Sequence, residues 1–308
     1  MRAASGSLVP TIQVCRKDPP MREAPPRITV ITPSFNQSEF LEETIISVLG
    51  QGYPNLEYIV IDGGSTDGSV DIIRRYENRL AYWVSEPDRG QSHAINKGLA
   101  RSTGDIVAWL NSDDCYRPGA LQAVAEIMCE GGAIVRPVVY GDCDVVDEHG
   151  SPIGHWKGLP LVRDRMIAFW RWNWELDWCI IQPATFIAGD LFRRNLLDEN
   201  LYLVMDRELF IRLSDSSPFS YVPRTLAAFR AYADSKTGKR GSSYAEELGQ
   251  VSRRHWGSGG RYVAFWLDHR CWHITSWSMR SIRLLVGERG WGVLRRVYRS
   301  SQVKHVVR

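Results

Sequence analysis

Two adjacent carboxylates, Asp113 and Asp114, lie just beyond the apolar run IVAWL at residues 106–110. Such a run is typical of a buried strand, and carboxylates at a strand end offer hard oxygen ligands to Mg²⁺ or Mn²⁺. An ion of this kind can in turn hold the phosphate oxygens of a nucleotide. The simpler alternative is a solvated turn before Pro118. The pair therefore provides candidate ligands for Mn²⁺ or Mg²⁺.

Polar turns also follow three earlier apolar runs. Asp62 closes the run LEYIVID, and its carboxylate could accept hydrogen bonds from a base or ribose, while Gly63 lets a ligand approach the backbone. Phe35, after the run ITVIT, could stack on a base. A structural Asx-turn for Asp62 and a core or surface position for Phe35 stay open as alternatives. The third turn is Glu86-Pro87-Asp88-Arg89-Gly90.

The elements that must position these turns alternate along the chain. Apolar runs and helical periodicity predict strands at 28–32, 56–62, 81–86 and 105–110 and helices at 38–49, 67–76, 91–101 and 117–130. Alternation with short connections predicts an α/β fold with a Rossmann-like, mostly parallel sheet and helices on both faces. Ligands bind beyond the carboxyl ends of such strands, so the four turns should meet at one edge.

The sequence also offers helix caps in the first half and a less regular hydrophobic pattern in the second half. We expect Asn36 or Ser38 to cap the first helix and Ser65 or Asp67 to cap the second. Beyond residue 135 the pattern predicts strands at 135–142 and 184–189, a short helix at 206–213 and edge strands at 219–230. The chain has neither a G-x-G-x-x-G motif nor a Walker lysine, which disfavours a dinucleotide enzyme and a P-loop NTPase.

Four segments, taken in order, resemble the family 2 glycosyltransferases of GT-A fold: ITPSFNQ, IVIDGGSTDGS, SEPDRGQSHAINKG and GDIVAWLNSDD. The match covers residues 28–130 and continues more weakly through QPATF, MDRELFIRL and SKT. The ordered combination is specific, although no single piece is. The resemblance implies a GT-A fold and the transfer of a sugar from a nucleotide donor to an acceptor, with inversion at the anomeric carbon.

The resemblance also implies roles for individual residues. In the family, the residue matching Phe35 packs against the base, the one matching Asp62 hydrogen-bonds it, and the position matching Lys97 is basic and faces the nucleotide. The acidic motif holds the metal on the diphosphate, with Asp114 the first choice as direct ligand and Asp113 beside it. Further nucleotide contacts are expected from Pro33, Asn36, Gly63 and Lys236.

In the resemblance, the carboxylate of Asp206 in MDREL is the general base. An acceptor hydroxyl is a poor nucleophile, and a carboxylate can remove its proton as the new bond forms. A single displacement inverts the anomeric carbon with one base and no covalent intermediate. The competing interpretation, a helix N-cap, is compatible with catalysis. Glu208 is the next candidate base, and Asp177 the third.

Two positions depart from the family pattern. His93 stands where relatives often carry Asp; a lone His is more often a structural hydrogen-bond partner, but this one could alter donor recognition. Tyr232 stands where many relatives have His, so a metal or diphosphate contact is not carried over to this position.

The segment FWRWNWELDW (169–178) is dense in tryptophan and lies between the donor half and the predicted base. Indole rings pack on sugar faces, so Trp172, Trp174 and Trp178 could line an acceptor groove. A core or interface cluster is the alternative.

Charge is distributed unevenly in this chain of 308 residues, whose formal net charge is only +3. Residues 251–308 hold twelve Lys or Arg, two Asp or Glu and five of the twelve Trp. A basic helical extension with Trp suits an anionic membrane surface. Packing on the core and a contact between two copies of the chain, as in a homo-oligomer, are the alternatives. Nucleic acid is disfavoured because no recognised module accompanies the charge.

We divide the chain into a flexible leader (1–26), a GT-A domain (27–250) and the basic extension (251–308). Within the domain, 27–130 forms the nucleotide-binding half and 131–250 the acceptor half. The first residues lack a signal-peptide core, no run of ~18 apolar residues occurs, and the six Cys are scattered. We expect a cytoplasmic protein, at the inner face of the cytoplasmic membrane if the extension binds lipid.

These features together predict a metal-dependent, inverting glycosyltransferase. It would move a sugar from a UDP-linked donor to a hydroxyl of a glycan or lipid-linked acceptor in surface polysaccharide assembly. A nucleotidyltransferase is one alternative, but the turn after the first strand lacks the Gly-rich phosphate loop of that class. A non-catalytic nucleotide-sugar-binding membrane scaffold is another, and the intact acidic residues at 62, 113, 114 and 206 argue against it.

Overall fold

The computed structural model describes residues 24–161, 163–167, 180–239 and 242–256. Trp172, Trp174, Trp178 and Asp177 lie outside the described residues, as does the chain after Trp256. The predictions of an acceptor groove at these tryptophans and of a helical basic extension therefore stay predictions.

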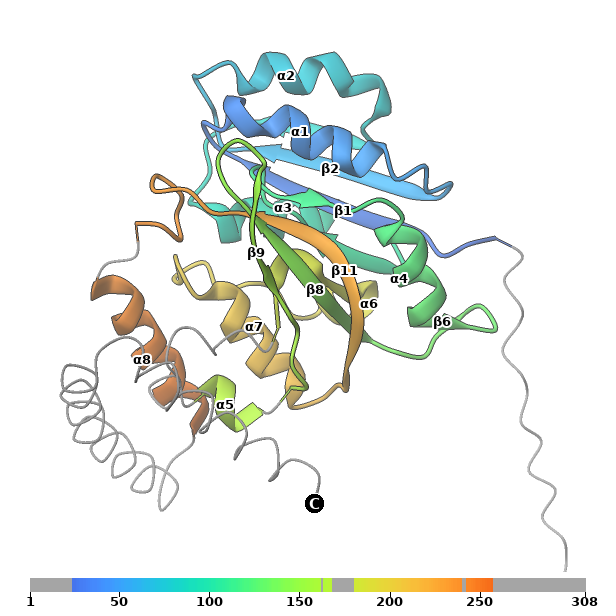
Figure 1. Cartoon of the computed structure of the whole chain (residues 1–308), viewed down its shortest axis with the longest axis vertical. Coiled ribbons are helices and arrows are strands. Elements are labelled where there is room, and N and C mark those ends of the chain that lie inside the picture. The colour runs from blue at the N-terminus through green and yellow to red at the C-terminus, as the bar shows by residue number, and fades with distance from the viewer. Residues whose placement is uncertain (1–23, 162, 168–179, 240–241, 257–308) are drawn as a thin grey trace, which may run out of the picture.

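The first half of the chain forms the parallel part of the sheet, in the order β3-β2-β1-β4 (Figure 1). These strands are β1 (Ile28–Ser34), β2 (Leu56–Asp62), β3 (Tyr82–Ser85) and β4 (Ile106–Trp109). The register pairs Ser34 with Asp62, and Asp62 with Ser85. The carboxyl ends of β1, β2 and β3 are therefore level, and parallel pairing of β4 with β1 brings the turn after β4 to the same edge, as predicted.

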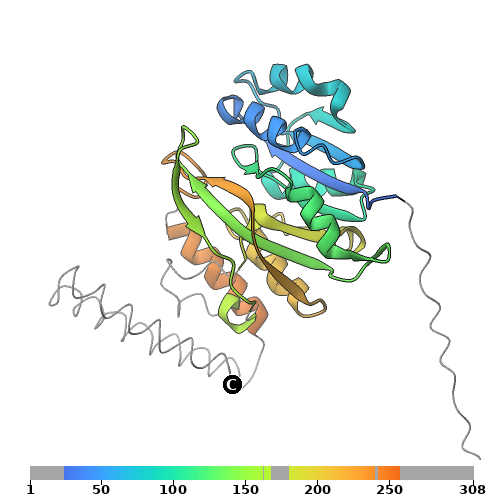
Figure 2. The same cartoon turned by 45° about the vertical axis from the view of Figure 1, so that its right-hand side comes forward.

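The second half extends the same sheet with strands of both directions. β10 (Thr185–Ala188) is antiparallel to β4, and β8 (Val138–Val146) is antiparallel to β10. β11 (Phe219–Arg230) runs parallel to β8, and β5 (Cys115–Tyr116) and β9 (Pro152–Trp156) complete the sheet (Figure 2). The stretch 219–230, predicted as edge strands, is one strand: among the described residues its first half pairs only with β8, as an edge does, while Ala227 and Ala228 also pair with β5.

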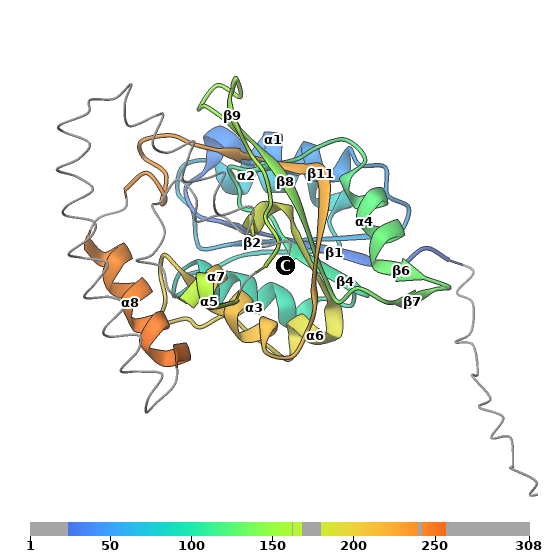
Figure 3. The same ribbon diagram turned by 60° about the horizontal axis from the view of Figure 1, so that its bottom comes forward.

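Helices cover both faces of the sheet, as predicted (Figure 3). One face carries α1 (Ser38–Leu49), α2 (Ser69–Tyr76) and α4 (Ala120–Met128), whose apolar residues join one buried cluster. The other carries α3 (Gln91–Arg101), α5 (Arg163–Ile167), α6 (Gly189–Arg193), α7 (Met205–Ser214) and α8 (Ser242–Trp256), which share a second cluster. Within the described residues, no helix is long and apolar enough to span a bilayer.

Several boundaries differ from the expected ones, and strand pairing accounts for the differences in two elements. The helix predicted at 117–130 ends at Met128, because Cys129–Glu130 (β6) pairs with Ala133–Ile134 (β7) in a small hairpin. The strand expected at 135–142 begins at Val138 and continues to Val146, since β11 and β9 both pair with its later residues.

The first two helices share one carboxylate at their N-termini. α1 begins after Gln37 and α2 after Gly68, and the side chains of these two N-cap residues do not cap the helices, nor does Asn36 or Ser38 cap α1 as expected. Asp67, one of the two residues expected to cap the second helix, accepts hydrogen bonds from the backbone N–H of Ser69 (3.0 Å) and of Ser38 (2.8 Å). Burial raises the pKa of Asp67, but the hydrogen bonds from Ser69 and Ser38 prevail and lower it to about 2.

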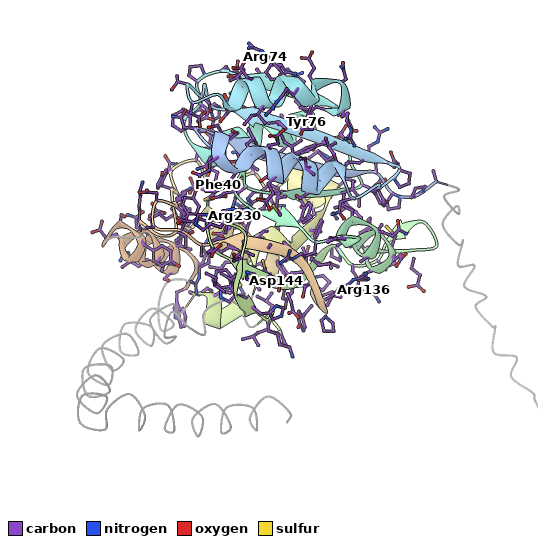
Figure 4. The ribbon with its side chains drawn as sticks, turned by 45° about the horizontal axis from the view of Figure 1, so that its top comes forward. Phe40, Arg74, Tyr76, Arg136, Asp144 and Arg230 are labelled. Atoms are coloured by element: carbon purple, nitrogen blue, oxygen red, sulfur yellow. The ribbon has the colours of Figure 1, made fainter. Side chains whose placement is uncertain are left out.

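Arg230, the last residue of β11, is buried between α1 and the turn after β4 (Figure 4). Its guanidinium donates to the carbonyl oxygens of Asp113 (3.1 Å), Asp147 (3.2 Å) and Glu148 (3.0 Å). It also pairs with Glu43 at 2.5 Å and lies 4.8 Å from the centroid of the Phe40 ring. One side chain thus joins β11, α1 and two turns that are distant in sequence.

We predict that Arg230→Met lowers the free energy of unfolding by about 3 kcal/mol, because three part-buried carbonyl oxygens lose their charged donor. Urea denaturation measures the change. Glu43→Gln is the matched control and should cost less than about 1 kcal/mol, since the Glu43 side chain is largely exposed. A loss for Arg230→Met no greater than for the control would show that the guanidinium does not hold these turns.

Candidate active site

A cavity of about 520 Å³ opens at the edge where the parallel strands end. Its wall includes residues that follow β1, β2, β3 and β4, together with residues from the start of α7 and from the loop after β11. Of the predicted site residues, it brings together Pro33, Phe35, Gly63, Asp113, Asp206 and Lys236. Segments far apart in the sequence therefore line the same cavity.

One end of the cavity is formed by Phe35, Gly63 and Asp88. Phe35 is 60% exposed, although it is a large apolar residue. A Cβ atom on Gly63 would lie 2.7 Å from a carboxylate oxygen of Asp88 and 3.3 Å from the Phe35 ring, so a larger residue there would have to displace the Asp88 side chain. An open aromatic ring beside a carboxylate is suited to a nucleoside base. Asp88 was not predicted, although its place in the polar turn after β3 could have indicated it.

Asp62 lies behind this end and is fully buried. Its carboxylate accepts hydrogen bonds from the backbone N–H of Gly64 (3.1 Å) and Ser65 (2.8 Å) and from the hydroxyls of Ser65 (2.5 Å) and Ser85 (2.7 Å). It is not among the described residues that line the cavity. In this structure Asp62 shapes the loop that carries Gly63, which is the Asx-turn alternative.

Asn36 and Lys97 also lie outside the described wall of the cavity. Asn36 has a left-handed backbone (φ 50°), and its side chain accepts a hydrogen bond from the N–H of Thr66 at 2.9 Å. Lys97 pairs with Glu86 at 2.8 Å. Both therefore support the turns after β1 and β3, and direct contact with a nucleotide stays a prediction for them.

The two carboxylates of the acidic pair have different surroundings. Asp113 lines the cavity and accepts a hydrogen bond from the Tyr232 hydroxyl at 3.1 Å. Asp114 is 1% exposed and accepts from the backbone N–H of Arg230 (3.0 Å) and from the side chain of Asn111 (3.1 Å). Burial and the neighbouring Asp113 raise the pKa of Asp114 well above its usual value. The carboxylate that faces the cavity is thus Asp113.

A polar network crosses the floor of the cavity. Lys236 donates to the side-chain oxygen of Gln91 (2.6 Å), and the Gln91 amide donates to Asn111 (2.6 Å). Asn111 donates to Gln182 (3.1 Å). Burial lowers the pKa of Lys236 to about 8, although Asp206, Glu247 and Asp113 each raise it. The lysine is therefore held near both predicted functional carboxylates.

Asp206 is the second residue of α7, whose N-cap is Val204, so it is not the N-cap itself. It lines the cavity. Glu208, the alternative base, is buried and bonded to Arg212 (2.8 Å) and His255 (3.1 Å). Burial raises the pKa of Glu208, but these two partners prevail and lower it to about 2. Glu208 does not line the described cavity, so the geometry favours Asp206.

Glu247 on α8 holds the loop that leads into α7, which the sequence did not reveal. Its carboxylate accepts hydrogen bonds from the backbone N–H of Tyr202 (3.2 Å), Leu203 (2.7 Å) and Val204 (3.2 Å). The ring of Tyr202 in turn lies 4.2 Å from the Lys236 ammonium. One carboxylate from α8 thus supports both the lysine and the start of the helix that carries Asp206.

Two other residues have structural partners in this region. His93 accepts a hydrogen bond from the backbone N–H of Arg89 at 3.1 Å, in keeping with a structural role. Ser34 lines the cavity, and its hydroxyl oxygen is buried without a hydrogen-bond partner in the described part of the chain.

The chain is similar to known glycosyltransferases over about half of its length. Residues 29–184 match the family model described as glycosyl transferase family 2. TuaG of Bacillus subtilis (strain 168), a glycosyltransferase assigned to teichuronic acid biosynthesis, is 41% identical over 138 residues, which are 44% of this chain and 54% of TuaG. An uncharacterized glycosyltransferase of Nostoc sp. is 35% identical over 178 residues, 56% of this chain and 52% of the relative. The chain thus matches about half the length of these curated relatives.

Two solved structures share the fold. Residues 1–349 of S. aureus TarS in complex with UDP-GlcNAc align with a TM-score of 0.57 at 16% identity, over 73% of this chain and 65% of that one. The mannosyltransferase PcManGT of Pyrobaculum calidifontis, in complex with GDP-Man and Mn²⁺, gives 0.58 at 18% identity, over 93% and 83%. The sheet and its helices are therefore of the GT-A type that the sequence predicts.

We predict that Glu247→Ala loosens the loop before α7 without unfolding the protein. The three N–H groups at 202–204 lose a charged acceptor, so their hydrogen exchange should accelerate about tenfold. Hydrogen–deuterium exchange measures this. Glu246→Ala, at the exposed neighbouring position on α8, is the control and should leave the loop unchanged. Equal exchange in both variants would contradict a supporting role for Glu247.

Proposed function

The chain belongs to glycosyltransferase family 2, and from this premise we propose that it transfers a sugar from a nucleotide-sugar donor to a hydroxyl of a glycan or lipid-linked acceptor. The observation that carries the proposal is the single cavity that holds Phe35, Asp113, Lys236 and Asp206. It offers a surface for a base, a carboxylate and an ammonium for the diphosphate, and a carboxylate for the acceptor. We further propose UDP as the nucleotide and inversion as the stereochemical outcome.

The diphosphate end has the ligands that a hard divalent cation requires. No group of three or more His, Cys, Asp or Glu side chains in the described chain is arranged to hold a metal by itself. Mg²⁺ and similar ions often use one or two carboxylates and complete their coordination with substrate phosphates and water. Asp113 fits that pattern, and we propose that it holds Mn²⁺ or Mg²⁺ together with the donor. The ion would neutralise charge on the leaving diphosphate.

The protein's own residues then supply the remaining steps. Asp206 takes the proton from the acceptor hydroxyl while that oxygen forms a bond to the anomeric carbon. The bond between the anomeric carbon and the phosphate oxygen breaks, and the nucleoside diphosphate leaves with the bonding electrons. Lys236, held by Gln91 and Tyr202, faces the same space and can stabilise the charge on that leaving group.

The alternatives have less support. A nucleotidyltransferase would need a Gly-rich phosphate loop after β1, where this chain has Ser34-Phe35-Asn36 and a helix start. A non-catalytic scaffold would not need a carboxylate at the position of Asp206.

We propose that the transfer serves surface polysaccharide assembly. The similarity to TuaG, which is assigned to teichuronic acid biosynthesis, supports this process.

We predict that Asp206→Asn binds UDP with Mn²⁺ as the wild type does but loses transfer by at least about 100-fold, because only the base is removed. Release of UDP from the donor measures turnover, and calorimetry measures binding. Asp215→Asn, at the other end of α7, is the control and should change neither. Near-wild-type turnover of Asp206→Asn would remove this residue from the mechanism.

We predict that Asp113→Asn loses the metal-dependent part of nucleotide binding while the ligand-free protein keeps its melting temperature. Thermal shift with a panel of UDP-, GDP- and dTDP-sugars, with and without Mn²⁺, tests the donor and the metal together. If a folded Asp114→Asn protein lost the metal effect and Asp113→Asn kept it, the ligand would be Asp114 instead.

We also propose that the basic, Trp-rich residues 255–308 hold the enzyme on anionic membranes, where a lipid-linked acceptor would reside. The full chain should sediment with anionic liposomes at low salt, whereas a chain that ends at Trp256 should stay in the supernatant. Equal partitioning of the two proteins would contradict membrane binding through this segment.

A further inference from the structure

Two basic side chains line the cavity among the described residues, Lys236 and Arg207, and they are held by different elements. Lys236 follows β11 and donates to Gln91 on the floor of the cavity. Arg207 is the third residue of α7, and its Nε donates to the carbonyl oxygen of Met166 on α5 at 2.9 Å. The proposed function uses Lys236 at the diphosphate and gives the guanidinium of Arg207 no part.

The guanidinium of Arg207 has donors that no described residue uses. Within the described chain, the bond from Nε to Met166 is the only hydrogen bond of this side chain, and it forms no ion pair with a described carboxylate. The described side-chain nitrogens and oxygens that are buried without a hydrogen-bond partner belong to other residues. The Nη1 and Nη2 atoms of Arg207 are therefore accessible as well as unpaired there, so a ligand can reach them.

The bond to Met166 restricts how the rest of the guanidinium is oriented. The group is planar with five N–H donors in a fixed arrangement, so holding Nε limits the directions of Nη1 and Nη2. These two nitrogens match the spacing of two oxygens on a carboxylate or a phosphate and bind them through paired, charge-assisted hydrogen bonds. A neutral hydroxyl offers one oxygen and no charge. The side chain is thus suited to an oxyanion.

The position of Arg207 indicates which substrate carries that oxyanion. Arg207 directly follows Asp206, the proposed base, and both residues line the cavity. Consecutive Cα atoms are about 3.8 Å apart, and consecutive helical side chains point about 100° apart. The guanidinium therefore lies to one side of the base, where α7 contacts α5. Because the base must contact the acceptor hydroxyl, an anion bound to Arg207 lies close to that hydroxyl.

We propose that Arg207 binds a phosphate or carboxylate group of the acceptor, next to the hydroxyl that receives the sugar. This inference rests on the proposed function, since it concerns the acceptor of the same reaction. It adds the substrate class, which is an acceptor with an anionic group such as a sugar phosphate or a sugar acid. The donor diphosphate does not need this guanidinium, because Lys236 and the proposed metal ion balance its charge.

The test compares charged probes with their neutral counterparts while saturating UDP and Mn²⁺ occupy the donor end. Methyl glucuronide is compared with methyl glucoside, and glycerol 3-phosphate with glycerol, by NMR titration of the full chain. The charged member of at least one pair should bind at least about tenfold more tightly. The two pairs separate the sources of the anion, because preference for the glucuronide indicates a carboxylate and preference for glycerol 3-phosphate indicates a phosphate.

Variants then assign the preference to the guanidinium. Arg207→Gln should reduce it at least about fivefold, because the charge and the paired donors are lost. Arg207→Lys should keep part of it, since an ammonium retains the charge without the planar arrangement. Arg253→Gln is the matched control. It removes the same charge from an exposed position on α8 that is not among the described residues lining the cavity, so the preference should be kept.

The outcomes separate this inference from the proposed function. Equal or undetectable binding of the charged and neutral probes to the wild type would overturn the anionic acceptor, whether or not a variant folds, and would leave the glycosyltransferase proposal intact. A preference unchanged in folded Arg207→Gln would overturn the role of Arg207. If this variant weakened UDP binding as much as binding of the charged probe, the guanidinium would serve the donor and the inference would be wrong. Failure of the wild type to bind any nucleotide with Mn²⁺ would instead count against the proposed function, and with it the inference.

Discussion

A buried guanidinium holds the two halves of the sheet together where the cavity opens. Arg230 ends the last strand, yet its hydrogen bonds go to the turn after β4 and to the turn between β8 and β9, and its carboxylate partner is on α1. A planar group with five donors can satisfy several carbonyl oxygens at once, which an ammonium cannot do with the same geometry. The backbone N–H of the same residue bonds Asp114, so the acidic turn is fixed from two sides.

These contacts of Arg230 explain why the neighbouring carboxylates of Asp113 and Asp114 lie in different environments. Asp114 is directed into the protein, where it accepts hydrogen bonds from Arg230 and Asn111. Asp113 is left on the cavity wall, where Tyr232 orients it. At the opposite end of the cavity Asp62 is likewise buried and shapes the loop after β2, and the exposed surface is left to Phe35, Gly63 and Asp88. At both ends a buried carboxylate fixes backbone that lines the cavity.

Much of the first half could be predicted from sequence, because its signals are local. A short apolar run followed by a polar turn identifies each parallel strand, and parallel pairing then brings the turns to one edge. The hydrogen bond from Ser85 to Asp62 and the support from Glu247 depend on residues distant in sequence. No local pattern reports such contacts. Asp67 shows the same limit, since it serves a helix that begins far before it in the chain.

The pairing of β5 with β11 has a consequence for how the protein is made. Cys115 and Tyr116 pair with Ala228 and Ala227, so this part of the sheet joins residues more than a hundred positions apart. A growing chain that has reached only α4 can assemble the parallel strands, but its acidic turn still lacks the hydrogen bonds from Arg230 and Tyr232. Long-range pairing of this kind is slow to form. During synthesis, the end of the cavity at Phe35 and Gly63 can therefore take shape before the turn of Asp113 receives its bonds from β11, and the cavity becomes complete only after Arg230 and α8 have emerged from the ribosome.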